Sequence, residues 1–464
     1  HKKYILFIMK KKIFIVFLIL VFFMTSALGC KKKTVSEATK PIELTYWRVY
    51  DGEDDFEEII KAYNALHPYV TIKYRKLRYE EYKDALLNAF AEDRGPDIFS
   101  IHNTWMKEYK SKIEPLPSQT SMVFQVEQGA LKKELVSETR VANSMTAKEL
   151  KQNFADVVYS DVVLDNKIYG LPLSVDTLAL YYNQNLFDQA GIVDVPKYWN
   201  TEFQQTVKKL TKQDSQGNIL QSGVALGGST NVERFSDILS VLMMQNGATM
   251  MNDSGTVLFH TIPQSMADSD YNPGFMALNF YTDFANPVKE VYSWNNTMEN
   301  SVNAFASGKV AMMFGYSYHL ETIKSLAPKL NFFVSPLPQI EGSATPINFA
   351  NYWVEVVSKK SKYVNEAWDF VQFLANANQV SSYLKKTNKP AALRSLIAKQ
   401  KDDETIGIFA NQAFTAKSWY KGSNSVLMEN FMAQMIDNFL LSTNSEESFS
   451  VMNLYANRIQ QTIN

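Results

Sequence analysis

The sequence contains very little cysteine: Cys30 is the only one in 464 residues. This excludes a disulfide scaffold and any zinc or iron–sulfur site built from several thiolates. The chain also lacks an excess of charge of either sign, because it contains 47 basic and 48 acidic residues. This balance argues against nucleic-acid binding by phosphate neutralisation. The nucleotide-binding patterns GxxxxGKS/T and GxGxxG do not occur, and the five histidines form no pair at metal-ligand spacing. We therefore expect no cofactor and no metal site.

Apolar sequence, in contrast, is plentiful. Hydrophobic residues make up 46% of the chain and charged residues 20%, which argues against a disordered, collagen-like or coiled-coil protein. At about 150 residues per domain, the length corresponds to two or three domains or to one large two-lobed body. A chain of this size buries enough apolar surface to fold without a disulfide or metal staple.

The first thirty residues have the pattern of an export signal. Lys10-Lys11-Lys12 precede an uncharged apolar run over 13–24, and small residues follow up to Cys30. Twelve apolar residues are too few to span about 30 Å of hydrocarbon as a helix. Ala27-Leu28-Gly29-Cys30 resembles the lipobox of bacterial lipoproteins, which implies cleavage before Cys30 and acylation of its thiol. An ordinary signal peptide that happens to contain a cysteine and an uncleaved membrane anchor are the alternatives.

Cleavage at this position would define the mature chain. We expect residues 1–29 to be a lipoprotein signal peptide and residues 30–40 to be the lipidated cysteine and a polar tether. The signal contains five lysines and no acidic residue, so the mature chain keeps 42 basic and 48 acidic residues, a formal charge of −6. The expected location is outside the cytoplasm, lipid-anchored to the outer face of the cell membrane or in the periplasm.

Residues 41–102 alternate between strand and helix patterns. Period-two alternation at 42–46 and 70–74 and an apolar run at 98–101 predict strands, and helical spacing at 56–66 and 82–90 predicts helices between them. This order indicates an α/β fold with a largely parallel sheet, which binds ligands beyond the carboxyl ends of its strands. Candidate residues at two such ends are Trp47, Arg48, Tyr50, Asp51, His102, Asn103 and Trp105. Further helical patterns cover most of 118–165, and 199–213, 233–246, 274–285, 298–306, 363–385 and 425–463.

Several short motifs, taken in their order, resemble those of a known family. The motifs are Gly95-Pro96-Asp97-Ile98, Lys167-Ile168-Tyr169-Gly170-Leu171-Pro172, Ala179-Leu180-Tyr181-Tyr182-Asn183, Phe305-Ala306-Ser307-Gly308-Lys309-Val310-Ala311-Met312-Met313, Ser335-Pro336-Leu337-Pro338 and Ala367-Trp368-Asp369-Phe370. Each is weak alone, but their order and spacing behind a lipobox are similar to those of family 1 extracellular solute-binding proteins. These are the maltose-binding-protein-like receptors of ABC importers, and the resemblance runs over most of 41–440.

The resemblance implies a periplasmic-binding-protein-like fold with two α/β lobes and a ligand cleft between them. Lobe 1 would contain 41–173 plus 354–385, and lobe 2 would contain 174–353 plus 386–464, with hinge strands near 171–176 and 352–357. The lobes of such receptors close over the ligand by hinge motion. The implied function is an extracytoplasmic receptor, active as a monomer, that binds an oligosaccharide or monosaccharide derivative and delivers it to the permease subunits without chemical change.

Sugars have hydroxyl-rich edges and apolar C–H faces, so sugar sites combine amide or carboxylate groups with flat aromatic rings. By position, the resemblance adds candidates to those at the strand ends, although each could instead serve packing. These candidates are Asp176, Tyr316, Tyr318, Asn351, Tyr352, Trp353, Trp419 and Tyr420. We expect alanine at Trp353 or Trp419 to weaken ligand binding with little loss of stability. No catalytic residue is expected.

Other ligands and functions stay open from the sequence. A non-sugar solute such as a polyamine, an organic phosphate or a peptide would suit the same receptor type. A polyamine site would need several carboxylates in the cleft, and only Asp51 and Asp176 are candidates. A glycan-processing lipoprotein enzyme and a structural or adhesive lipoprotein are further alternatives. Release of new reducing ends from oligosaccharides would identify the enzyme.

Replacement of Cys30 by serine tests the lipid anchor. Because the acyl chains attach through the thiol, Cys30→Ser should move the protein from the membrane fraction to the soluble fraction of the cell. The measurement is cell fractionation combined with the intact mass of the protein. Retention of Cys30→Ser in the membrane with the N-terminal segment uncleaved would show an apolar helical anchor instead.

Overall fold

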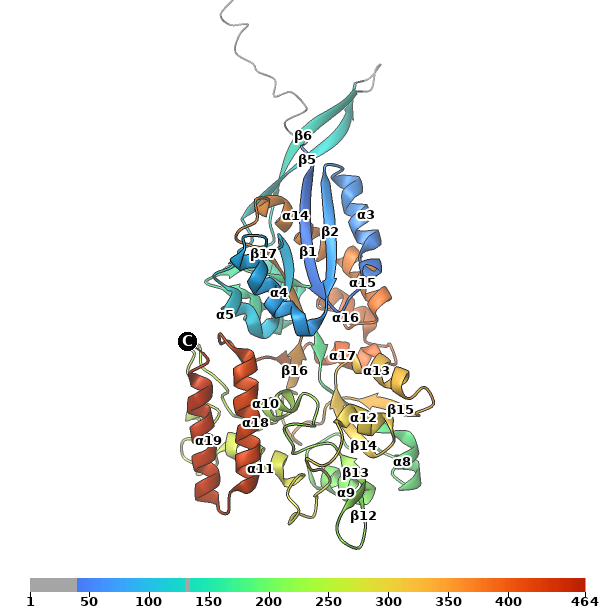
Figure 1. Cartoon of the computed structure of the whole chain (residues 1–464), viewed down its shortest axis with the longest axis vertical. Helices are drawn as coiled ribbons and strands as arrows, with labels where there is room; N and C mark the ends of the chain where they lie inside the picture. The colour runs from blue at the N-terminus through green and yellow to red at the C-terminus, as the bar shows by residue number, and fades with distance from the viewer. Residues whose placement is uncertain (1–39, 130–133, 464) are drawn as a thin grey trace, which may run out of the picture.

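The computed structural model describes residues 40–129 and 134–463, which form two α/β lobes joined by short strands (Figure 1). The predicted signal peptide and the Cys30 anchor lie outside the described residues. Within the described residues, no helix has both the length and the apolar character required to cross a membrane.

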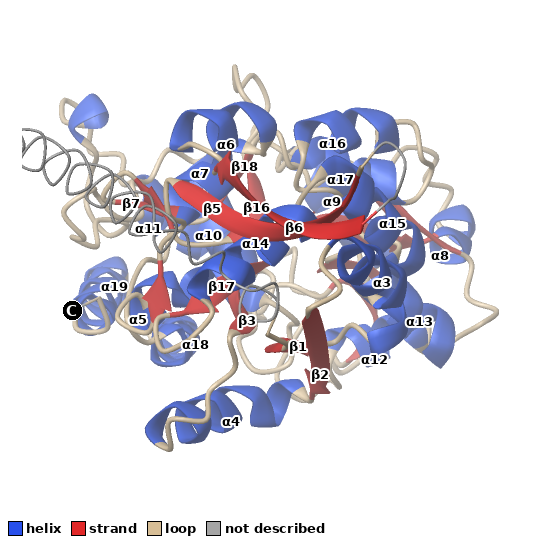
Figure 2. Cartoon of the chain, turned by 90° about the horizontal axis from the view of Figure 1, so that it is seen from above, coloured by secondary structure: helices blue, strands red, loops and turns tan. Residues whose placement is uncertain are grey.

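The first lobe is built on a mixed sheet in the order β2-β1-β3-β17-β4, with β9 paired to β17. β1 runs parallel to β2 and β3, as the strand–helix alternation predicted, and β17 joins antiparallel to β3. The elements are β1 (Ile42–Val49), η1 (Glu53–Asp55), α3 (Glu57–Leu66), β2 (Val70–Leu77), α4 (Tyr79–Ala91), β3 (Ile98–His102), η2 (Asn103–Trp105), α5 (Met106–Tyr109), β4 (Ile113–Glu114), β5 (Gln119–Gln128), β6 (Glu134–Asn143), α6 (Ala147–Asn153), α7 (Asp156–Val162), β7 (Val163–Leu164), β8 (Lys167–Ile168), β9 (Leu171–Pro172), β17 (Trp353–Ser358), α14 (Val364–Leu374), α15 (Ala377–Thr387) and α16 (Arg394–Gln400). Seen from above, α4 lies on one side of β1, β2 and β3 and α14 on the other (Figure 2).

The second lobe contains a five-stranded sheet in the order β12-β13-β14-β11-β15. All six residues of the central strand β14 are buried, as expected for a strand covered on both faces. The elements are β11 (Ala179–Asn183), α8 (Gln184–Gln189), α9 (Thr201–Leu210), β12 (Lys212–Gln213), β13 (Ile219–Val224), α10 (Phe235–Gln245), η3 (Gln264–Met266), α11 (Pro273–Asp283), α12 (Ser301–Ala306), β14 (Val310–Gly315), α13 (His319–Leu326), β15 (Phe332–Ser335), α17 (Ile406–Gln412), α18 (Ser425–Leu441) and α19 (Ser445–Gln460).

Asparagine side chains start many of these helices. In each case the side-chain oxygen accepts a hydrogen bond from a backbone N–H of the first helical turn, which would otherwise lack a partner. The capping residues are Asn183, Asn200, Asn272, Asn300, Asn376, Asn424 and Asn444. The helical patterns predicted over 363–385 and 425–463 each correspond to two helices. Asn376 and Asn444 cap the second helix of each range.

The helical prediction for residues 118–165 is wrong in its first half. β5 and β6 pair over ten residues as a long antiparallel hairpin that extends from the first lobe (Figure 1). Along β5, Thr120 and Met122 alternate with exposed residues and face the lobe, and β-branched and aromatic side chains favour the strand. The base is fixed to α14 because the Asn365 side chain donates to the Ser121 carbonyl at 2.8 Å and accepts from its N–H at 2.7 Å.

Three segments connect the lobes. The first is 173–175, followed by β10 (Asp176–Thr177), and the second is Tyr352, between β16 (Asn348–Asn351) and β17. The third segment follows α16 and includes β18 (Ala416–Lys417). β16 pairs with both β10 and β18, and these three strands form a small hinge sheet. The boundary predicted at 386 falls inside the first lobe in the structure, because Leu396 and Ile397 of α16 pack into its core.

The carboxylate of Asp161, at the end of α7, ties these connections together. It accepts hydrogen bonds from Tyr352 in the second connection at 2.7 Å and from Ser418 in the third at 2.5 Å. Asn103, which follows β3, donates to it at 3.1 Å. Burial raises the pKa of Asp161, and the three hydrogen bonds oppose that shift. One buried carboxylate of the first lobe therefore contacts two of the three connections.

Candidate functional site

A narrow cavity lies where the two lobes meet. Its free space is about 20 Å³, room for a single water molecule. Pockets that bind small organic ligands measure about 300–1,000 Å³, so a ligand of that size requires the two walls to separate. The lining residues are His102, Asn103, Thr104, Arg234, Ser236, Asp237, Ser240, Phe349, Ala350, Asn351, Ser418, Trp419, Tyr420, Met428 and Glu429, which come from both lobes and the hinge.

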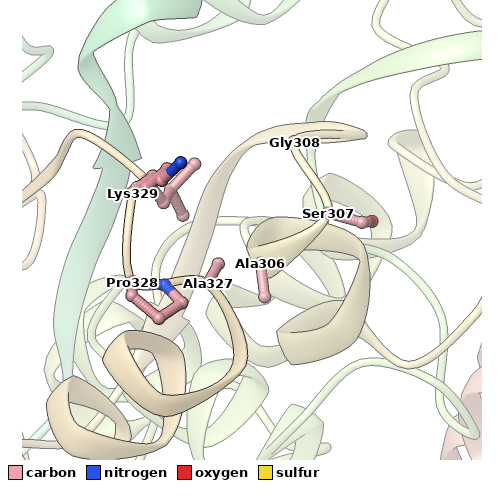
Figure 3. A pocket seen from close by; sticks show the side chains of 7 residues that line it. Ala306, Ser307, Gly308, Ala327, Pro328 and Lys329 are labelled. Atoms are coloured by element: carbon pink, nitrogen blue, oxygen red, sulfur yellow. The ribbon is translucent and has the colours of Figure 1, made fainter.

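A larger hollow of about 430 Å³ lies on the second lobe, between the ends of α12 and α13 (Figure 3). Its walls are made mainly of small side chains such as Ala306, Ser307 and Ala327, and Lys329 is its only charged residue. This surface has few groups that could orient a ligand. The interlobe cavity, with polar groups on both sides, is the stronger candidate.

An aromatic wall of the first lobe lies beside the cavity, outside its lining, and Trp353 connects the two through an edge-to-face contact with His102 at 5.7 Å. Tyr50 stacks on Tyr79 with ring centroids 5.7 Å apart, and Trp353 meets Tyr50 edge to face at 5.9 Å. Tyr50 and Tyr79 are 53% and 46% exposed, so their rings are available to a ligand. Tyr50 has a φ of 64°, a strained backbone conformation for an aromatic residue. Sequence reasoning missed Tyr79, although it follows the carboxyl end of β2 just as Tyr50 follows that of β1.

The wall from the second lobe is charged. Arg234 donates to both carboxylate oxygens of Asp237, at 2.9 and 3.0 Å, and to Glu429 at 3.1 Å. Tyr316 also donates to Asp237, at 2.6 Å. Arg234 has a φ of 54°, a second strained backbone position at the cleft. Sequence reasoning missed Arg234, Asp237 and Glu429, because their helices α10 and α18 are far apart in the chain and carry no motif.

Charged groups of the second lobe shift the pKa values of two tyrosines in the aromatic wall. Burial raises the pKa of Tyr50, Tyr79 and Glu80 raise it further, and Arg234 across the cleft opposes the shift. Burial likewise raises the pKa of Tyr79, and Glu429 of the second lobe adds to it. The aromatic wall therefore lies within electrostatic reach of the charged wall.

Asp176 occupies the hinge beside the second lobe, where the sequence predicted an acidic contact. It accepts hydrogen bonds from the Ser317 N–H at 2.9 Å and hydroxyl at 2.6 Å, and from the Thr177 N–H at 2.8 Å. Burial raises its pKa to about 6, although these hydrogen bonds oppose the shift. Tyr318 is half-exposed nearby and stacks on the buried Tyr316 at 5.8 Å.

Arg48 and Asp51 take part in a buried ionic network. The Arg48 guanidinium donates to Glu355 and, at 2.8 Å, to Asp51. Tyr46 donates to Glu355 at 2.7 Å, and Asp51 also accepts from Tyr383 at 2.9 Å and from Lys389. Burial favours a higher pKa for Asp51, but Arg48 and Lys389 outweigh it and hold the pKa below its usual value. The network fixes the loop that carries Tyr50.

The remaining candidates divide between the cavity and the protein interior. His102, Asn103, Asn351, Trp419 and Tyr420 line the cavity, whereas Trp47 lies under the Arg75 guanidinium at 4.7 Å. Trp105 is buried against Trp353 at 5.3 Å, and Tyr352 donates to Asp161. His102 Nε2 lies 3.2 Å from Asn351 Oδ1, and burial lowers its pKa to about 4, so the ring is neutral at pH 7.

Two of the aromatic candidates at the cavity form hydrogen bonds with residues of the second lobe. Trp419 is 6% exposed and donates from Nε1 to Ser240 at 2.9 Å, and Tyr420 donates to Thr462 at 2.8 Å. Among the described residues, no group of three or more metal-ligating side chains is close enough to hold a metal ion.

Comparison with known proteins places these features in context. The family of bacterial extracellular solute-binding proteins matches residues 51–380. The multiple sugar-binding protein of Streptococcus mutans is 22% identical over 324 residues, 69% of this chain and 73% of its own. A binding protein of Brucella abortus is 24% identical over 331 residues, 69% of this chain and 68% of its own. The fold is similar to that of the cyclic α-maltosyl-1,6-maltose-binding protein of Arthrobacter globiformis, with a TM-score of 0.68, 17% identity and coverage of 91% and 99% of the two chains.

Loss of the Arg48 charge should destabilise the protein. Arg48→Met leaves Glu355 charged and buried, and the expected loss in the free energy of unfolding is about 3–5 kcal/mol by urea denaturation. Addition of Glu355→Gln should restore part of this loss because it removes the uncompensated charge. The control is Arg75→Met on β2, which removes an exposed guanidinium stacked on Trp47. Equal losses in Arg48→Met and Arg75→Met would contradict the network's role.

The raised pKa of Asp176 predicts a pH dependence of stability. Because the pKa rises from 3.8 to about 6 on folding, the folded protein binds this proton more tightly, and the carboxyl group lowers stability as the pH rises through that window. The melting temperature of Asp176→Asn minus that of wild type should therefore be more positive at pH 7 than at pH 4. The exposed Asp194→Asn is the matched control. A pH-independent difference for Asp176→Asn would refute the assignment.

Proposed function

Because the chain belongs to the family of bacterial extracellular solute-binding proteins, we propose that it is the receptor of an ABC importer for a carbohydrate. The solute would bind in the interlobe cleft and pass unchanged to the permease subunits. One observation carries the choice of ligand: an aromatic wall with half-exposed Tyr50 and Tyr79 faces a hydrogen-bonding wall with Asp237 and Glu429. The sugar-binding relative from Streptococcus mutans supports the same ligand class.

The two walls suit the two kinds of surface on a sugar. The rings of Tyr50, Tyr79 and Trp353 offer flat apolar faces for C–H groups. Carboxylates and the amides of Asn103 and Asn351 offer acceptors and donors for hydroxyl groups. Because the lining residues come from both lobes, a sugar gains the full set of contacts only when both lobes touch it. This arrangement couples binding to closure.

Closure would take place at the small hinge sheet. β10 and β16 carry Asp176 and Asn351, which are paired in register, so two candidate ligand contacts lie in the hinge itself. The walls on either side move with the lobe cores. Support for the receptor's place outside the cytoplasm comes from the family, whose members are extracellular. Anchoring through acylated Cys30 and a monomeric state are part of the same proposal.

A second candidate ligand is a cationic solute such as a polyamine. The observation in its favour is the number of carboxylates: Glu233, Asp237 and Glu429 add to the Asp176 identified from the sequence. The aromatic wall suits a cation as well as a sugar, because ring faces attract positive charge. A thermal-shift comparison of oligosaccharides with spermidine separates the two ligand classes.

The ring of Tyr79 provides the most selective test of sugar binding. Tyr79→Ala should weaken the best oligosaccharide from a screen about tenfold or more by calorimetry, whereas Tyr79→Phe, which keeps the ring, should stay within about threefold of wild type. Tyr50→Ala and Trp353→Ala should weaken it similarly. The control is Tyr198→Ala, a partly exposed tyrosine of the second lobe that does not belong to the aromatic wall.

Equal binding by Tyr79→Ala and wild type would place the ligand elsewhere. Because the Trp419 ring is buried and hydrogen-bonded, Trp419→Ala should reduce stability by about 3–5 kcal/mol as well as binding, contrary to the expectation from sequence alone. Catalytic release of reducing ends would contradict the receptor function itself.

A further inference from the structure

The side chains around the interlobe cavity carry more negative than positive charge. On the second lobe, Asp237 and Glu429 line the cavity with Arg234, and Glu233 precedes Arg234 in the chain. The Glu233 N–H donates to Ser301 Oγ at 2.9 Å, and the charge of its carboxylate raises the pKa of Tyr50 and of Tyr318. Three carboxylates therefore accompany one guanidinium on this wall.

Arg234 is already engaged by its neighbours. Its Nε and Nη2 donate to the two oxygens of Asp237, and Nη2 also donates to Glu429. A bidentate pair of this kind uses the same fork that would bind a ligand carboxylate or phosphate. The left-handed backbone at Arg234 holds the side chain in this arrangement at the start of α10. An incoming anion would have to compete with two carboxylates for this group.

The other groups near the cleft do not offset the surplus. Arg48 and Lys389 are tied to Asp51 and Glu355 in the buried network. His102 is neutral at pH 7 because burial lowers its pKa to about 4. In the described part of the chain, no cationic group lies within ion-pair distance of Glu233, whose carboxylate accepts a hydrogen bond from the Asn300 side chain at 3.5 Å. Lys421 and Lys107 donate to the carbonyls of Ser160 and Ile463 and line a separate pocket beside the cavity. Among the described residues that line the cavity itself, Arg234 is therefore the only cation at pH 7.

From this we infer that the cleft discriminates against anionic saccharides and binds neutral or amino-substituted oligosaccharides, with Glu429 and Asp237 setting this preference by occupying Arg234. The inference rests on the proposed function and narrows its substrate class. Like charges brought together in a partly dehydrated cleft repel strongly, which is a common source of specificity. Uronic-acid and phosphorylated sugars would meet this repulsion, whereas protonated amino sugars would not.

Matched oligosaccharides test the preference directly. Calorimetry on the purified full chain at low salt would compare neutral mannotriose and maltotetraose with the cationic glucosamine trimer and the anionic trigalacturonate. We expect at least one neutral or cationic oligomer to bind about tenfold or more tightly than trigalacturonate. Added salt should narrow the difference between the anion and the neutral oligomers, because ions screen the repulsion.

A charge-neutral substitution at Glu429 provides a gain-of-function test. Glu429→Gln releases one partner of Arg234 and removes one negative charge, so the affinity for trigalacturonate should rise about tenfold. The matched control is Glu202→Gln on α9, the same change on an exposed residue outside the cavity lining, and it should leave all affinities unchanged. Salt dependence in wild type provides a readout that does not depend on folding of the variant.

The outcomes separate this inference from the function on which it rests. If trigalacturonate binds as tightly as the neutral oligomers or more tightly, the inference is overturned and the carbohydrate receptor stands. If Glu429→Gln folds but gains no affinity for trigalacturonate, Arg234 is not the determinant. If no oligosaccharide of any charge binds, the proposed function and the inference both fall.

Discussion

The buried carboxylate of Glu355 is the constraint on which the first lobe depends. It lies in β17, inside the sheet, where an unpaired charge would be very unfavourable. Arg48 on β1 and Tyr46 beside it provide the compensating contacts. Arg48 in turn forms an ion pair with Asp51, and Asp51 accepts hydrogen bonds from Lys389 and Tyr383. One buried charge thus determines the contacts of four segments. Tyr50 and Trp353, which the same strands carry, are positioned at the cleft as a consequence.

The cleft, in contrast to this buried network, is partly exposed and contains strained backbone. The rings of Tyr50 and Tyr79 are half-exposed, and two residues of the cleft, Tyr50 and Arg234, adopt left-handed backbone conformations that glycine would adopt with less strain. Such strain persists only where the surroundings hold the residue in place. A rigid ionic network below a strained and open surface is consistent with a site that is preorganised in each lobe and completed when the lobes meet.

Sequence patterns predicted the parts of this molecule that depend on short-range periodicity. The alternation over 42–101 correctly gave the parallel part of the first sheet, and the ordered motifs gave the family. The hairpin β5–β6 was missed because its alternation is mixed with polar residues that also suit a helix. Arg234, Asp237 and Glu429 were missed because ion pairs between α10 and α18 depend on tertiary contact. Arg48 and Asp51 were predicted as site residues because they lie at a strand end. Residue spacing cannot show that both side chains form buried ion pairs with residues distant in the sequence.

Asp161 has a mechanical consequence for the whole molecule. Because its carboxylate holds Asn103, Tyr352 and Ser418 together, segments of two connections are tied at a single point beside the first lobe. The hydrogen bond from Asn103 lies within the first lobe, so movement of the connections loads only the bonds from Tyr352 and Ser418. Two of the three connections therefore share one anchor on the first lobe, which restricts how independently they can move.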